Sequence, residues 1–221
     1  MEIRLASLLQ GAQEAEGTTI IIDVFRAFTT AAVAFDRGAE HIVLVAEVEE
    51  ALDLRRRGVG HLCMGEVDGK RPAGFDFGNS PYEVSQADFT GKTLIQSTRA
   101  GTVGVNAAAV ADTLYLGSLV IATATVNSIL ASTPPLVSIV AMGSAATWRS
   151  DEDEQCALFL RNLLQGRRPV MRLCKSSSSS ARKPRNTAIH PNRTSTHAIV
   201  RWLCTSTATL LPYACGAKMA F

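Results

Sequence analysis

Short, continuous apolar runs alternate with alanine-rich stretches along the first 170 residues of the chain. Such runs are typical of parallel strands that are buried on both faces. We expect strands at Thr19–Val24, Ile42–Val45, Thr93–Gln96, Thr113–Leu116 and Leu136–Met142. Helices are expected at Phe28–Arg37, Val48–Arg57, Val103–Ala111 and Glu152–Leu164, the last ending before Gly166. Strands that alternate with helices in this way predict a layered α/β fold.

The charges divide the chain into two parts. All 20 acidic residues lie at or before Glu154, whereas the 67 residues from Gln155 onward contain 11 Lys and Arg and no carboxylate side chain. A typical globular segment carries both signs of charge. We therefore predict an α/β domain over residues 1–171 and an irregular, basic, Ser/Thr-rich tail over residues 172–221.

Three interpretations of the tail remain open. A shifted reading frame or damaged gene end explains the abrupt change in composition, and we prefer it. A disordered extension is the second interpretation, and a basic segment that binds nucleic acid is the third. Only Trp202, Tyr213 and Phe221 are aromatic after residue 170, so stacking on bases has little support. No nucleic-acid partner is expected.

Composition sets the expected compartment. Hydrophobic residues make up 47% of the chain, enough for a sizeable core, and no apolar stretch is long enough to cross a membrane. The five cysteines show no framework spacing, which favours a reducing compartment. We expect a cytoplasmic protein without membrane contact.

Two segments of the predicted domain resemble each other. Ile21–Thr29 is similar to Leu94–Thr102, and Ala39–Leu44 is similar to Ala111–Leu116, at nearly the same offset. Each unit has a strand, an Arg-Ala-x-Thr loop, an alanine-rich helix and a second strand. Either the domain contains an internal duplication, or two ordinary βαβ units are similar by chance. A duplication would place Arg26 and Arg99 at equivalent strand ends, where open α/β sheets bind ligands.

The chemistry of these two loops suits an anion. A strand end that leads into a helix presents free N–H groups and the positive end of the helix dipole. An arginine adds a permanently charged fork that matches phosphate or sulfonate oxygens. The hydroxyls of Thr29, Thr30 and Thr102 either donate to a ligand or cap the helices, and capping is the more common role.

A glycine-rich stretch over residues 65–81 contains Glu66, Asp76 and Asn79. Oxygen ligands on such a loop suit Mg²⁺, although Asp and Asn also organise turns. Glu154 is a further candidate carboxylate, or simply negative charge at a helix start. Cys156 falls early in an amphipathic helix, so a buried thiol is the better interpretation than a nucleophile.

Taken in order, these segments resemble one known family. The blocks are Ile20–Thr30, Gly65-Glu66, Gly74–Pro81, Gln96–Thr102, Ser118–Thr125 and Asp153–Ala157. Together they are similar to the conserved blocks of the 2-phosphosulfolactate phosphatases over residues 1 to about 171. The end of the chain does not resemble that family.

The resemblance implies a three-layer α/β/α fold with two similar halves. It also implies Mg²⁺-dependent hydrolysis of a small anionic phosphate ester, with 2-phosphosulfolactate as the expected substrate, in coenzyme M biosynthesis. By this resemblance Asp23, Arg26, Asp76 and Arg99 are the expected catalytic residues. The expected substrate contacts are Thr29, Thr30, Asn79, Ser80 and Thr102, and the expected metal ligands are Asp23, Glu66, Asp76 and Glu154. A homodimer is expected. The alternative is an inactive anion-binding relative with a frame-shifted end.

Overall fold

The computed structural model describes residues 1–167, 198–202 and 217–220. The elements of the first half are β1 (Glu2–Ser7), α1 (Leu8–Gln13), β2 (Gly17–Ile22), α2 (Ala27–Asp36), β3 (His41–Val45), α3 (Val48–Arg56), β4 (Leu62–Gly65) and α4 (Pro81–Ser85). They are followed by β5 (Thr93–Ser97), α5 (Gly101–Ala107), β6 (Ala111–Gly117), η1 (Leu119–Ile121), α6 (Ala122–Ser132), β7 (Leu136–Ala141), α7 (Asp151–Leu164), β8 (Ala198–Trp202) and β9 (Ala217–Ala220).

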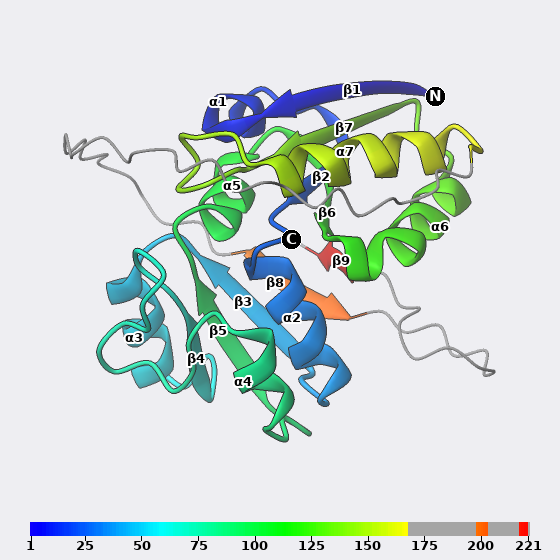
Figure 1. Ribbon diagram of the computed structural model, residues 1–221. Helices are drawn as coiled ribbons and strands as arrows, with labels where there is room; N and C mark the ends of the chain where they lie inside the picture. Colours follow the sequence, from blue (N-terminus) through cyan, green and yellow to red (C-terminus); the bar gives the residue numbers. More distant parts are fainter. Residues whose placement is uncertain (168–197, 203–216, 221) are drawn as a thin grey trace.

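The strands form one sheet in the order β1-β7-β2-β6-β9-β8-β3-β5-β4. β1, β7, β2 and β6 are parallel to one another, and so are β3, β5 and β4. The antiparallel strands β9 and β8 lie between these two parallel groups and pair with β6 and β3. Figure 1 shows the first group in the upper part of the molecule and the second in the lower part.

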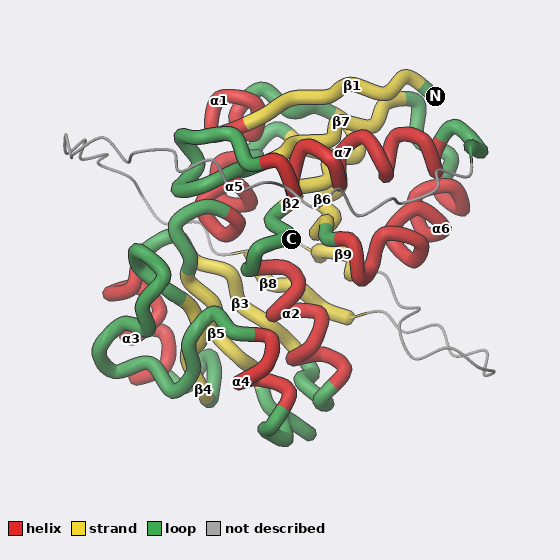
Figure 2. The backbone as a smooth tube through the Cα atoms, in the orientation of Figure 1, coloured by secondary structure: helices red, strands yellow, loops and turns green. Residues whose placement is uncertain are grey.

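Helices cover both faces of the sheet, as Figure 2 shows. Alternate residues of β2 belong to different clusters: Ile21 packs on one face, and Ile20 and Ile22 on the other. The first cluster includes residues of α1, α2, α4 and α5, whereas α6 and α7 cover the opposite face of the upper group and α3 that of the lower group. The predicted three-layer α/β/α architecture is confirmed.

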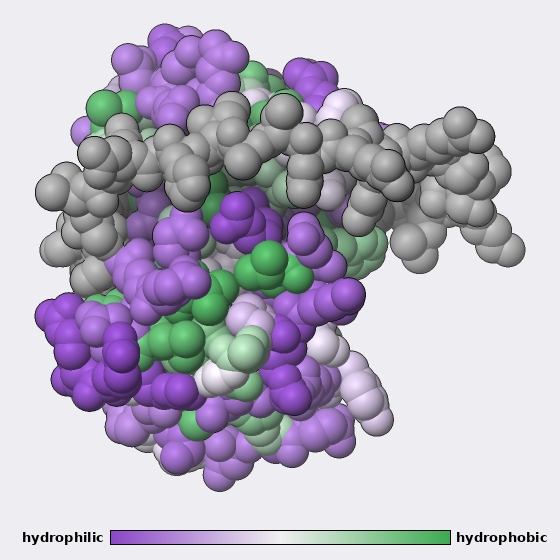
Figure 3. All heavy atoms as spheres, turned by 90° about the vertical axis from the view of Figure 1, so that its left-hand side faces the viewer, coloured by the Kyte–Doolittle hydropathy of each residue, from purple (hydrophilic) through white to green (hydrophobic). Residues whose placement is uncertain are grey.

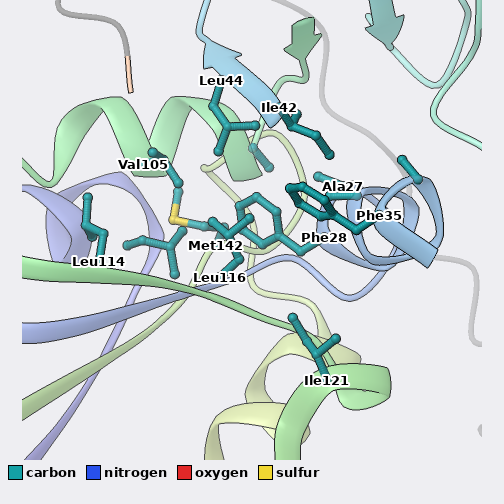
Figure 4. Packing of buried hydrophobic residues seen from close by; sticks show 14 of the residues in the cluster. Ala27, Phe28, Phe35, Ile42, Leu44, Val105, Leu114, Leu116, Ile121 and Met142 are labelled. Atoms are coloured by element: carbon teal, nitrogen blue, oxygen red, sulfur yellow. The ribbon is translucent and has the colours of Figure 1, made fainter. Parts of the chain in front are cut away.

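The largest cluster joins the two parallel groups. Figure 4 shows Phe28 of α2 and Val105 of α5 beside Leu116 of β6, Leu44 of β3 and Met142. Each of these side chains is at most 3% exposed. The helices α2 and α5 therefore share one core with strands from both groups.

The two similar units cross between the groups in opposite senses. The first unit leaves β2 in the upper group, passes through α2 and enters β3 in the lower group. The second leaves β5 in the lower group, passes through α5 and enters β6 in the upper group. This exchange is the structural form of the predicted two similar halves.

The expected strands and helices all occur, with ends shifted by a few residues, and Gly166 ends α7 at a φ of +74°. Elements that we did not expect include β1, α1, β4 and α4. Of the predicted irregular tail, the described residues are the strands β8 and β9. The rest of the predicted tail, 172–197, 203–216 and 221, lies outside the described residues.

Candidate active site

The two arginine loops lie at the carboxyl ends of β2 and β5, and both lead into crossover helices. Arg26 directly precedes α2, and Arg99 comes two residues before α5. The parallel strands point toward the left-hand side of Figure 1, which Figure 3 turns toward the viewer. Hydrophobic residues gather in the middle of that face, surrounded by hydrophilic ones. The predicted equivalence of the two arginine positions is confirmed.

Asp23 ties the two loops together. Its Oδ1 accepts a hydrogen bond from the Ala27 N–H at 3.0 Å, and its Oδ2 accepts one from the Gly101 N–H at 2.8 Å. These are the first residues of α2 and α5, so one carboxylate lies against the positive ends of both helix dipoles. We expected these N–H groups to bind the substrate anion, and instead Asp23 occupies them.

Gln96 completes this junction and was not predicted as a site residue. Its side-chain amide, on β5, donates to the carbonyl oxygen of Ala27 at 2.9 Å. Both backbone groups of Ala27 are therefore held, the N–H by Asp23 and the carbonyl by Gln96. The available sequence signal was a glutamine that directly follows Leu94 and Ile95 in a strand expected to be buried.

Asp153, rather than the predicted Glu154, faces the Asp23 loop. Asp153 is 2% exposed, and its carboxylate accepts from the N–H groups of Val24 at 2.7 Å and Gly143 at 2.8 Å. Glu154 instead accepts from the Ser7 hydroxyl at 2.7 Å. Asp153 shares the buried face of α7 with Cys156, three residues on. The helical period could have identified it.

Glu66 has a similar role at the second arginine loop. Its Oε1 accepts from the Arg99 N–H at 2.9 Å and its Oε2 from the Gly69 N–H at 2.7 Å. Glu66 therefore joins the loop after β4 to the loop after β5.

Burial and like charge change the titration of the central carboxylates. Removal from water raises the pKa of Asp23 to about 7, and the nearby negative charges of Asp153 and Glu66 add to this effect. The hydrogen bonds from the backbone act in the opposite direction. Burial likewise raises the pKa of Asp153.

The two arginines are exposed and differ in their partners. The Arg99 guanidinium lies 3.7 Å from the carboxylate of Glu47, an exposed and therefore weak pair. Arg26 forms no ion pair with any residue of the described ranges. The neighbouring Phe25 side chain is 72% exposed, and the Phe25–Arg26 peptide bond is cis.

The contacts of Asp76 favour a structural role over the predicted one. Its carboxylate accepts from the Cys63 N–H and pairs with Arg55 of α3, both at 2.8 Å. The segment containing Phe77 runs beside β4, which places Asp76 level with Cys63 rather than with Glu66 at the strand end. Asp76 therefore links α3 and β4, and among the described residues it forms no hydrogen bond or ion pair with the arginine loops.

Of the predicted substrate contacts, Ser80, Thr29 and Thr102 form hydrogen bonds within the protein, whereas Asn79 Oδ1 and Thr30 Oγ1 are buried without a hydrogen-bond partner among the described residues. Ser80 caps α4 by accepting from the Glu83 N–H, and Asn79 is buried at 7% exposure. Thr29 donates to the carbonyl of Val24 at 2.7 Å, and Thr102 donates to that of Thr98 at 2.9 Å. Thr30 is also fully buried. Neither hydroxyl caps its helix, because the N-caps of α2 and α5 are Arg26 and Ala100 and have no side-chain cap hydrogen bond. The hydroxyls of Thr29 and Thr102 instead hold the loops that precede these helices.

The four predicted metal ligands do not form one cluster. Among the described residues, no three His, Cys, Asp or Glu side chains come close enough to hold a metal ion. Asp76 and Glu154 make the separate contacts given above. Of the four predicted ligands, Asp23 and Glu66 are the two that interact electrostatically with each other.

Cysteine chemistry is not supported at this site. Cys63 and Cys156 are buried, and burial raises the pKa of both thiols, that of Cys63 to about 11. A neutral, buried thiol is a poor nucleophile. The interpretation of Cys156 as a core residue is confirmed.

With this geometry in place, comparison with known proteins identifies the family. The family model for 2-phosphosulpholactate phosphatase matches residues 5–192. The chain belongs to this family. The match continues past residue 171, where the resemblance by motif ends.

Curated relatives carry matching names. A protein of Thermotoga petrophila is 42% identical over 85 residues, 38% of this chain and 37% of the relative. A Bacillus subtilis protein is 33% identical over 149 residues, 66% of this chain and 64% of the relative. A Clostridium acetobutylicum protein is 30% identical over 164 residues, 74% and 69% of the two chains. Each is named a probable 2-phosphosulfolactate phosphatase. The first two matches span less than two thirds of the relative.

Within residues 1–167, 198–202 and 217–220, every helix is too short or too polar to span a bilayer.

Proposed function

We propose that this protein is a Mg²⁺-dependent phosphatase that hydrolyses a small anionic phosphate ester. Membership of the family supports the reaction class. The observation that carries the proposal is the meeting of two arginine loops at Asp23, which joins the first residues of α2 and α5. Two permanently charged side chains on adjoining loops suit a substrate with more than one anionic group.

The proposed substrate is 2-phosphosulfolactate, the compound that appears in the names of the relatives. It carries a phosphate, a sulfonate and a carboxylate. Arg26, which is free of ion pairs in the described ranges, and Arg99, which is weakly paired, would bind two of these groups through the guanidinium fork. Holding two ends of the molecule fixes the phosphate ester in one orientation.

Mg²⁺ is compatible with a smaller ligand set than the predicted four. This ion is usually held by one or two carboxylates, with waters and phosphate oxygens completing the shell. Asp23 and Glu66 are close enough to interact electrostatically, and each carboxylate has lone pairs beyond those used by two N–H groups. When bound, the ion would neutralise charge on the phosphate and orient it. The protein's own contribution is to hold the arginine loops in place.

Release of inorganic phosphate from 2-phosphosulfolactate by the full chain tests this proposal. We expect turnover with Mg²⁺, loss of turnover in excess chelator, and recovery when Mg²⁺ is restored. 2-Phospholactate, which lacks the sulfonate, is the matched control and should have a higher KM. Absence of turnover on both esters, with binding of phosphate retained, would instead support the inactive anion-binding relative.

Two expectations from the sequence remain predictions. Light scattering of the full chain would decide between the expected homodimer and a monomer. The cytoplasmic location would be decided by fractionation of the source cells.

A further inference from the structure

Asp153 holds the first arginine loop by its backbone. It lies in the first turn of α7, is 2% exposed, and accepts from the Val24 N–H at 2.7 Å. Val24 stands two residues before Arg26. The second oxygen of Asp153 accepts from the Gly143 N–H in the loop after β7. One carboxylate therefore fixes the loop after β2 against its neighbour in the sheet.

The second arginine loop is held in the same way. Glu66 accepts from the N–H of Arg99 itself and from a glycine N–H, that of Gly69. In each half of the molecule, one carboxylate oxygen accepts from the arginine loop, and the second oxygen accepts from a glycine N–H outside that loop. The two halves therefore repeat this arrangement of contacts as well as the crossover units.

Burial of the Asp153 carboxylate has an energetic cost. A buried carboxylate loses hydration, and Asp153 also lies close enough to Asp23 for the two negative charges to repel. Charge-assisted bonds to two N–H groups offset part of this cost and fix the loop more rigidly than neutral bonds would. At 2% exposure Asp153 does not itself reach a substrate.

We propose that Asp153 is a positioning residue that sets the Arg26 loop for substrate binding, as Glu66 does for the Arg99 loop. The inference rests on the proposed function and extends it to a residue of α7. It assigns separate supports to the two arginines. Loss of Asp153 is therefore expected to act mainly through Arg26, whose loop it contacts directly, and to reach the Arg99 loop only through Asp23.

A double-mutant cycle on the full chain separates this role from a general structural one. Asp153→Asn keeps the side-chain size but can accept from only one of the two N–H groups. We expect it to lower kcat/KM for phosphate release by about tenfold in the wild-type background and in Arg99→Lys. In Arg26→Lys the same substitution should cost much less, because the guanidinium fork that it positions is already absent. Asp151→Asn is the matched control, since it removes one exposed charge from the same helical turn and should leave kcat/KM unchanged.

The Kd of inorganic phosphate, measured by calorimetry on the same variants, should show the same pattern. If Asp153→Asn does not fold, Asp153→Glu, which keeps both acceptor oxygens on a longer arm, replaces it in the cycle. Equal losses in the two arginine backgrounds, with an active wild type, would overturn the positioning role alone. A wild-type chain that neither turns over the ester nor binds phosphate would overturn the proposed function, and this inference with it.

Discussion

The carboxylate of Asp23 accepts a 2.8 Å hydrogen bond from the backbone N–H of Gly101, 78 residues further along the chain. This contact joins the loop between β2 and α2 to the first residue of α5. The connection from β2 to β3 and the connection from β5 to β6 meet at this contact. The proposed activity depends on this junction, because it sets how the two arginine loops lie relative to each other.

Gly101→Ala should break the junction. A Cβ at this position would lie 2.8 Å from Asp23 Oδ2 and 2.9 Å from the Ala27 Cβ. Overpacking of this kind costs about 1–3 kcal/mol, and the displaced loops should lower kcat/KM. Urea unfolding and phosphate release measure the two effects. Alanine forms helices more readily than glycine, so any loss of stability would come from the crowding and not from helix propensity. A variant as stable and active as the wild type would show that the close approach of Gly101 to Asp23 is unimportant.

Stability should fall as the pH rises toward neutrality. The pKa of Asp23 is about 7 in the folded protein and near 3.8 when exposed, so between these values the folded state holds a proton that the unfolded state releases. The free energy of unfolding then decreases with pH over this window, and the raised pKa of Asp153 acts in the same direction. Urea unfolding of metal-free protein at several pH values measures the slope. Asp23→Asn should make it less steep, and an unchanged slope would contradict the assignment to Asp23.

Asp76 should prove structural. Asp76→Asn weakens the pair with Arg55 and the bond from the Cys63 N–H, so we expect a loss of about 1 kcal/mol in unfolding free energy for this partly exposed group. The value of kcat/KM should remain that of the wild type. A large loss of turnover at unchanged stability would restore Asp76 to the site.

The arginines should not tolerate replacement by lysine. Arg26→Lys and Arg99→Lys keep the charge but lose the fork, and we expect each to reduce kcat/KM by about tenfold, or about 1.4 kcal/mol. Arg149→Lys, whose side chain is 70% exposed and pairs with Glu154, is the control. If both site variants match this control, the arginines do not bind the substrate.

Much of the fold could be predicted from sequence because buried parallel strands leave continuous apolar runs. β2 and β3 follow this pattern, and the repeated Arg-Ala loops indicated the equivalence of β2 and β5. β4 was missed because Leu62–Gly65 is too short to show a period. β8 and β9 were missed because both fall in the segment that its composition marked as an irregular tail.

The site was harder to predict than the fold. The repeat placed both arginines after predicted strands, whereas Asp23, at the end of the predicted strand Thr19–Val24, was named only through the family resemblance. Sequence spacing could not show that the carboxylate of Asp23 turns back to the helix N–H groups, because Gly101 is brought there only by the crossover of α5. The contacts of Asp76 could not be predicted, because the segment around Phe77 folds back along β4. Its neighbour in space, Cys63, is 13 residues away in sequence.

The most direct test of the account is the turnover number of Asp23→Asn with 2-phosphosulfolactate and Mg²⁺, measured as phosphate release beside the wild type. An asparagine fits the same space but cannot accept from both Ala27 and Gly101, so the two loops lose their common anchor. We predict an active wild type and a variant that folds but whose kcat is lower by about 10²-fold, the cost of misplacing reacting groups by about 1 Å. A folded variant with the kcat of the wild type would contradict the claim that Asp23 organises the active site.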